Sequence, residues 1–325
     1  MWNMLWTVSL FFQFPTAPIA SALLVSDAHA DSLQTVTVDT ARPPFELQVA
    51  GESVQFSVMA AFVLPGELVP ISVTSLDSGF AVQADAGTLQ TSARNQWDWR
   101  APAESGVYPV RLFRDGEEAV TLNVFVMVPY DRMKNGRIGG YTIGPYPMPS
   151  ARQGEAYQRP RGFVEVTAVN DTTLVAPHFR LKQFLCKSGE SYPKYVVLQP
   201  ALLVKLERLL ETANDHGAQA STFQLMSAYR TPSYNRRIGN TTSFSRHHYG
   251  DAADIFVDES PADGRMDDLN GDGRQTKSDA VVLSAWAEQL DRESETRAGG
   301  LSAYGSTDSH GPFVHVDARG HSARW

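Results

Sequence analysis

The chain has 325 residues, of which 42% are hydrophobic and 20% charged, so it can form sizeable cores and two domains. Its net charge of −8 and pI near 5.5 argue against nucleic acid as a partner, because phosphate contacts need a basic face. A single cysteine, Cys186, excludes an intrachain disulfide and a cysteine-held metal cluster.

Residues 1–30 are typical of a secretory signal peptide. An apolar stretch over residues 5–25 is followed by a small-residue site, Ala28-His-Ala30, which predicts cleavage after residue 30. No Lys or Arg precedes Arg42 and prolines interrupt the apolar stretch, so retention as a weak anchor is the alternative. We expect a periplasmic or secreted protein with no membrane span after cleavage.

Residues 31–130 predict an immunoglobulin-like β-sandwich. Short apolar or alternating runs recur about every ten residues and are separated by Gly, Pro and Asp, which is the spacing of sandwich strands. These runs are Phe45–Val49, Val54–Val58, Val69–Val73, Val107–Leu112 and Val120–Val126. The sequence shows no catalytic constellation here, so we interpret this domain as a binding or spacing module.

An ordered connector is predicted over residues 131–175, which are rich in Gly, Pro and Tyr. A compact α+β domain over residues 176–325 follows. Leucines at helical spacing predict a helix over residues 200–214, and residues 223–227 predict a strand. The whole chain is therefore expected to be α+β, a sandwich followed by a domain with a small antiparallel sheet.

Residues 258–292 predict an insertion that contains a calcium loop. Asp268, Asn270, Asp272 and Asp279 stand at the ligand positions of such a loop, and a glycine stands at its sharp turn. A helix over residues 280–290 is predicted to follow. The alternative interpretation is an acidic, glycine-rich surface loop.

Three residues of the C-terminal domain predict a zinc site: His247, Asp254 and His315. A catalytic zinc takes three protein ligands of the His and Asp type and keeps a fourth position open. The apolar runs 255–257 and 313–316 predict strands that carry Asp254 and His315, with His247 in the loop before them. The alternative is a buried polar pair of the kind that holds many cores together.

The string S-x-H-x-x-G-x-A-x-D at residues 245–254 resembles the zinc D-Ala-D-Ala metallopeptidases, which share a zinc fold with hedgehog-like and lysostaphin-like domains. The segment Ser227-Ala-Tyr-Arg-Thr-Pro-Ser-Tyr-Asn235 and the ending that starts at His315-Val-Asp also match that family. Three motifs in the right order make the resemblance specific, and it covers roughly residues 176–325.

This resemblance implies a D,D-carboxypeptidase or murein endopeptidase that hydrolyses D-amino-acid-containing bonds by metal-activated water. Its substrate would be the stem peptides or cross-links of peptidoglycan. The resemblance also implies that Arg230 clamps the substrate, because a guanidinium offers a planar fork to a carboxylate or carbonyl. A structural arginine that holds its own loop is the alternative for Arg230.

The identity of the general base is open. Many family members place an acid three positions before the last ligand, where this chain has Pro312. His310, Asp308 and Asp317 are the remaining candidates, and Asp317 is also placed to orient His315. The missing acid supports an alternative function, a catalytically inactive zinc-fold protein that binds the cell wall.

Overall fold

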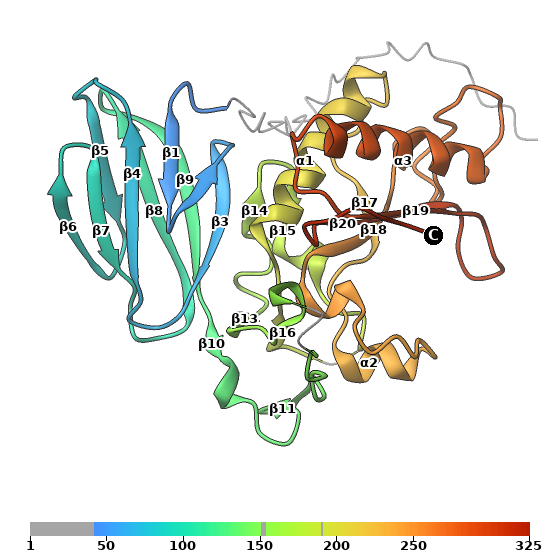
Figure 1. Ribbon diagram of the computed structural model, residues 1–325, viewed down its shortest axis with the longest axis horizontal. Coiled ribbons are helices and arrows are strands. Elements are labelled where there is room, and N and C mark those ends of the chain that lie inside the picture. The colour runs from blue at the N-terminus through green and yellow to red at the C-terminus, as the bar shows by residue number, and fades with distance from the viewer. Residues whose placement is uncertain (1–41, 151–153, 190) are drawn as a thin grey trace, which may run out of the picture. The chain divides into compact units, whose positions relative to one another are not determined.

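Figure 1 shows the computed structural model of the chain, which describes residues 42–150, 154–189 and 191–325. These residues belong to one unit of the chain, Val38–Trp325; the other unit, Met1–Thr37, and the predicted signal peptide lie outside them. The described chain is mostly β-structure, with few helices and several sheets. None of its helices is long and apolar enough to cross a membrane.

Two sheets make up the N-terminal half and lie face to face in Figure 1. The first, in the order β2-β1-β4-β7-β6, consists of β2 (Glu52–Val54), β1 (Glu46–Val49), β4 (Leu68–Thr74), β7 (Gln96–Arg100) and β6 (Thr88–Ala93). The second, in the order β3-β9-β8-β5, consists of β3 (Val58–Val63), β9 (Glu117–Val126), β8 (Gly106–Arg114) and β5 (Phe80–Ala84). All pairs are antiparallel except β3 with β9, which is parallel.

The side chains of these strands alternate between a shared core and solvent, as one-sided burial of a sheet requires. In β4, Val69, Ile71 and Val73 are buried and the residues between them are more exposed. Trp99 is fully buried, and its indole N–H donates to the carbonyl of Ala86 over 2.8 Å, which satisfies its one polar group. We refer to these two sheets as the sandwich.

Short elements connect the sandwich to the C-terminal sheet. Three strands form a small sheet: β10 (Val128–Pro129), β13 (Gly162–Val166) and β16 (Lys194–Val196). One hairpin pairs β11 (Arg137–Ile138) with β12 (Tyr141–Thr142). A second hairpin pairs β14 (Leu174–Ala176) with β15 (Phe179–Arg180). Three 3-10 turns lie among them: η1 (Tyr130–Arg132), η2 (Glu155–Tyr157) and η3 (Leu181–Phe184).

The C-terminal sheet has the order β17-β18-β20-β19-β21, with β17 (Gln224–Ser227), β18 (Ala252–Phe256), β20 (Phe313–Asp317), β19 (Gly300–Tyr304) and β21 (Ala323–Arg324). Its central strands are fully buried or nearly so. Helix α3 (Lys277–Arg292) packs on β19 and β20, and α1 (Pro200–Asp215) packs on α3. A short helix, α2 (Pro232–Arg237), and the turn η4 (Arg246–Tyr249) lie between β17 and β18.

The predicted helix over residues 200–214 is confirmed as α1. Pro200 occupies its first turn, where a missing N–H costs nothing, and the five predicted leucines are buried at 0% exposure. The strand predicted at residues 223–227 is β17. Helix and sheet together give the metal-ligand candidates a rigid support.

Candidate metal centre

The fold brings His247, Asp254 and His315 together. Asp254 lies in the middle of β18 and is paired with His315 on β20, while His247 comes from η4. One ligand atom from each lies within 4.8 Å of the others, and all three residues are buried. Among the described residues, these three form the group of His, Cys, Asp and Glu side chains that could hold a metal ion.

Gly250 makes this approach of η4 to the sheet possible. It ends η4 with φ +73°, in the left-handed region that favours glycine. A Cβ atom there would lie 2.3 Å from the carbonyl oxygen of Val197, so any side chain would push the backbone at Val197 away. The glycine of the S-x-H-x-x-G string thus lets His247 and Asp254 be close in both sequence and space.

Hydrogen bonds fix the orientation of both imidazole rings. His247 Nδ1 lies 2.6 Å from the carbonyl oxygen of Ala228, which can only accept, so Nε2 keeps its lone pair. That Nε2 lies 3.4 Å from Asp254 Oδ1. His315 presents Nδ1 to the same oxygen at 3.0 Å, so two nitrogens and one carboxylate oxygen face one point.

Asp317 supports His315 from behind. Its carboxylate lies 3.2 Å from His315 Nε2, as the same-face spacing of residues 315 and 317 suggested. The carboxylate also accepts from the backbone N–H of Gly300 at 2.8 Å and from Arg319 Nε at 2.9 Å. Asp317 is fully buried, so these donors replace the water it has lost.

Charge is concentrated in the group. Burial opposes ionisation of Asp254, but the His247 charge and hydrogen bonds from His247 and His315 outweigh it and hold the pKa of Asp254 well below its usual range. Burial also disfavours a charged His315 ring, yet hydrogen bonds to Asp254 and Asp317 raise the pKa of His315 to about 9. A metal ion would displace that proton on binding.

Arg230 contacts the second oxygen of Asp254 through Nη2, and its Nε donates to Ser227 Oγ over 2.6 Å. Its backbone N–H donates to the carbonyl of His247 over 3.1 Å. The side chain is 14% exposed and lines the cavity above the group. Arg230 therefore holds one ligand candidate in place and also faces whatever enters the cavity.

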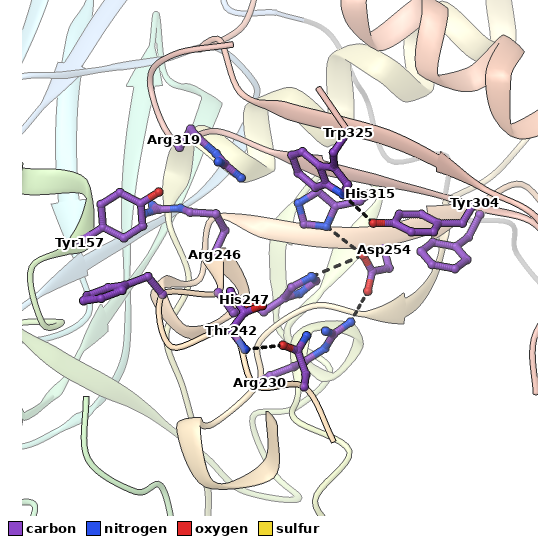
Figure 2. A pocket seen from close by; sticks show the side chains of 14 residues that line it. Tyr157, Arg230, Thr242, Arg246, His247, Asp254, Tyr304, His315, Arg319 and Trp325 are labelled. Atoms are coloured by element: carbon purple, nitrogen blue, oxygen red, sulfur yellow. Dashed lines mark hydrogen bonds and ion pairs between the residues drawn. The ribbon is translucent and has the colours of Figure 1, made fainter. Parts of the chain in front are cut away.

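The group opens into a cavity of about 600 Å³, which we call the metal cavity (Figure 2). Most of its wall comes from residues that belong to no motif of the sequence. Tyr304 and Trp325 line it on one side, and the indole Nε1 donates to Tyr304 Oη over 2.6 Å. The Trp325 ring lies 5.2 Å from that of His315. No motif signalled Tyr304, because one aromatic residue in a strand is usually core.

The opposite wall comes from the connector and from η4. Tyr157 of η2 lines the metal cavity and packs edge-on against Phe244, with ring centroids 5.6 Å apart. Arg246 lies over the Tyr157 ring at 4.7 Å and forms a buried ion pair with Asp251. The only advance signal for this wall was the high tyrosine content of the connector.

His310 and Asp308 lie outside the residues that line the metal cavity. Both line a different cavity together with Pro312, on the hairpin between β19 and β20. His310 Nδ1 lies 2.8 Å from the carbonyl oxygen of Gly311, and its ring packs edge-on against Phe313 at 5.0 Å. The described structure therefore does not bring these two base candidates to the metal-ligand candidates.

The predicted calcium ligands also do not form a metal-binding group within the described residues. Asp268 accepts backbone N–H groups of its own loop, among them that of Gly271 at 2.8 Å. Asp279 is fully buried at the start of α3 and accepts from the backbone N–H groups of Leu269 at 2.9 Å and Thr276 at 2.7 Å. Loop closure and helix capping account for these carboxylates, and calcium is not supported.

Comparison with known proteins supports a metallopeptidase. Residues 177–268 match the family model described as Peptidase M15, and this stretch contains His247 and Asp254 but not His315. No curated protein matches the chain. The crystal structure of the Lin-41 filamin domain matches with 11% sequence identity over 26% of this chain and 97% of that chain; its TM-score of 0.18 is too low to indicate a shared fold.

Proposed function

We propose that the chain is a zinc-dependent peptidase that hydrolyses D-amino-acid-containing bonds in peptidoglycan stem peptides or cross-links. The observation that carries this proposal is the convergence of two imidazole nitrogens and one carboxylate oxygen in the metal cavity. The Peptidase M15 match over residues 177–268 supports the same class of enzyme. The finer assignment, D,D-carboxypeptidase or murein endopeptidase, rests on the resemblance of the sequence motifs.

The donor set fits zinc. Two histidines and one carboxylate, with other ring nitrogens held by a carbonyl and a carboxylate, are characteristic of zinc sites that keep a position for substrate. Calcium and magnesium prefer oxygen ligands and suit this group poorly. When bound, a zinc ion supplies Lewis acidity, which polarises a carbonyl group and activates water at neutral pH.

The side chains around the group can bind and orient a peptide. Arg230 keeps Asp254 aligned and leaves part of its guanidinium toward the metal cavity, where it can bind a carbonyl or carboxylate. Tyr304 Oη accepts from Trp325, so its own proton is available to a substrate oxygen. A hydrogen bond at that place would stabilise charge that develops on the scissile carbonyl.

The site of action in this proposal is the cell envelope. The signal-like residues 1–30 support export, although they lie outside the described structure. We propose that the sandwich is an immunoglobulin-like module that keeps the enzyme on a polymeric substrate. Apart from Asn95 its buried side chains are apolar, and its described residues contain no group that could hold a metal ion.

The placement of the candidate bases outside the metal cavity favours one alternative function. None of the predicted bases lines the metal cavity, and Pro312 stands where the resemblance places an acid. Among the described residues that line the metal cavity, Asp254 is the only one with a carboxylate side chain. A zinc-fold protein that binds the cell wall without hydrolysing it is therefore the second candidate.

Digestion of purified peptidoglycan separates the two functions. The protein lacking residues 1–30 is incubated with peptidoglycan, with a chelator and with added zinc, and the muropeptides are read by mass spectrometry. Zinc-dependent loss of a terminal residue or of cross-linked dimers is the expected result. If the muropeptides are unchanged although the protein carries one zinc per chain, the peptidase proposal fails and the cell-wall-binding function is favoured.

A further inference from the structure

A second cavity, of about 290 Å³, adjoins the metal cavity and is unusually rich in arginine. Five arginines contribute to its lining, together with a single carboxylate, Asp251; we call it the arginine cavity. The arginines are Arg159, Arg161, Arg246, Arg297 and Arg319. The full chain carries a net charge of −8, so this local excess of positive charge runs against its overall balance.

Three of the five arginines are already neutralised by carboxylates. Arg161 pairs with Glu67 at 2.6 Å, Arg246 pairs with Asp251, and Arg319 pairs with Asp317. Each of these guanidinium groups is held by its carboxylate partner, which cancels its charge. The charge available to a ligand must therefore come from the two that remain.

Arg159 and Arg297 have no ion-pair partner among the residues that the structure describes. Arg159 lies over the ring of Tyr130 at 4.8 Å, an arrangement that fixes the guanidinium plane and leaves its N–H edges free to donate. Arg297 packs across Gly320, where a Cβ atom would lie 3.1 Å from Arg297 Nη2. Two unpaired cations therefore border one small cavity.

The wall of the arginine cavity is anchored to the C-terminal domain. Arg246 Nη1 donates to the carbonyl of Ala156 over 2.5 Å, and its guanidinium lies between the rings of Tyr157 and Tyr249, at 4.7 and 4.9 Å. These contacts fix the segment that carries Arg159. The cavity is consequently preformed, which lowers the entropic cost of binding a ligand.

Arg246 and Arg319 line both the arginine cavity and the metal cavity, so the two adjoin along these side chains. From this continuity and from the unpaired charges, we infer that the arginine cavity binds a carboxylate carried within the peptide, away from its C-terminus, while the scissile bond of that peptide lies at the metal centre. Arg159 and Arg297 are the residues that recognise it. The inference rests on the proposed function and makes the ligand a carboxylate-bearing peptide.

The size and charge of the cavity favour a peptide carboxylate over a phosphate polymer. A volume of about 290 Å³ accommodates one residue, not a polymer segment. Two guanidinium groups match a single carboxylate well, through charge-assisted hydrogen bonds of the fork type. A polyanion would need a longer basic track than these two residues provide.

The test compares two peptides and two proteins. The peptides are L-Ala-γ-D-Glu-L-Lys-D-Ala-D-Ala and the same peptide with the α-carboxylate of its glutamate amidated. The proteins are wild type and Arg159→Gln/Arg297→Gln, both as the chain lacking residues 1–30, and affinity is measured by calorimetry in the zinc-free state, where no hydrolysis occurs. We expect amidation to weaken wild-type binding about tenfold and to change binding by the variant less than twofold.

The matched control is Arg274→Gln/Arg292→Gln, which removes the same charge from exposed positions outside the lining of the arginine cavity. In this control, amidation should weaken peptide binding by the same factor as in wild type. If amidation weakens binding equally in wild type and in the Arg159 and Arg297 variant, the inference is overturned. It is also overturned if wild type binds both peptides equally. If discrimination is lost in the variant but zinc brings no hydrolysis, the inference stands and the proposed peptidase fails.

Discussion

The sandwich and the C-terminal sheet bury different kinds of side chain. Among the polar and charged side chains that are buried in the described residues, Asn95 is the one from the sandwich; all others lie between Lys205 and Asp317. Buried charge is costly unless it is paired, so it accumulates where a site needs it. The difference places the buried charge of the described residues in the C-terminal domain, which is where the proposed chemistry needs it.

Among residues that are not metal-ligand candidates, removal of Arg230 should give the largest effect on activity without loss of fold. Arg230→Ala leaves one oxygen of Asp254 without its partner and takes a guanidinium out of the metal cavity. Loss of such a supporting contact typically costs about 10–100-fold in metal affinity or activity. Steady-state hydrolysis of a stem peptide, measured beside zinc content, checks this, and unchanged kinetics would contradict the assigned role.

Lys205 tests whether the C-terminal sheet depends on buried charge for its stability. It is fully buried on α1, and its ammonium lies 2.8 Å from Asp291 Oδ1 and 2.8 Å from the carbonyl oxygen of Asp317. Lys205→Met leaves the Asp291 carboxylate unpaired, and breaking a buried pair in this way costs about 3–5 kcal/mol. Urea denaturation should show the loss, and Lys205→Met/Asp291→Asn should recover part of it.

Leu112 provides the matching test for the sandwich. It is 1% exposed in β8, and Leu→Ala in a packed core costs about 3 kcal/mol. Leu112→Ala should lower the denaturation midpoint while zinc binding and hydrolysis per folded molecule stay at wild-type values. A change in zinc affinity in this variant would break the separation between scaffold and site.

The smallest predicted effect concerns pH. Glu207 on α1 holds His178, with Nδ1 2.6 Å from Oε2, and this hydrogen bond outweighs burial and raises the pKa of His178 above its ordinary value of 6.5. Because the folded pKa is the higher one, the stabilisation is complete below pH 6.5 and is lost as pH rises through the folded pKa. The difference in free energy of unfolding between wild type and His178→Gln should therefore shrink from pH 6 to pH 9. A difference that grows over this range would contradict a stabilising contact between His178 and Glu207.

The sequence predicted the parts of the fold that periodicity encodes. Strand alternation located β1, β4, β8 and β9, and the leucine spacing located α1. The run 54–58 was less informative, because β2 ends at Val54 and β3 begins at Val58, on different sheets. Which strands become neighbours depends on long-range packing, which a single run of residues does not contain.

The site residues that lie in sequence motifs were predictable, and those that lie outside such motifs were not. His247 and Asp254 stand in one string, and the spacing of His315 and Asp317 showed that they share a face. The placement of His310 could not be predicted, because it depends on the hairpin between β19 and β20. There His310 packs against Phe313 and lines a cavity other than the metal cavity. The aromatic walls and Arg159 come from three distant segments that only the folded chain brings together.

The most direct test of the metal centre is the zinc content of the protein. After equilibration with zinc and removal of the free metal, mass spectrometry of the bound metal should give one zinc per chain for wild type and almost none for His247→Ala. The exposed Arg292→Gln variant, prepared in the same way, should match wild type. A wild type without zinc, or a His247→Ala variant that retains a full equivalent, would contradict the assignment of His247, Asp254 and His315 as the metal ligands.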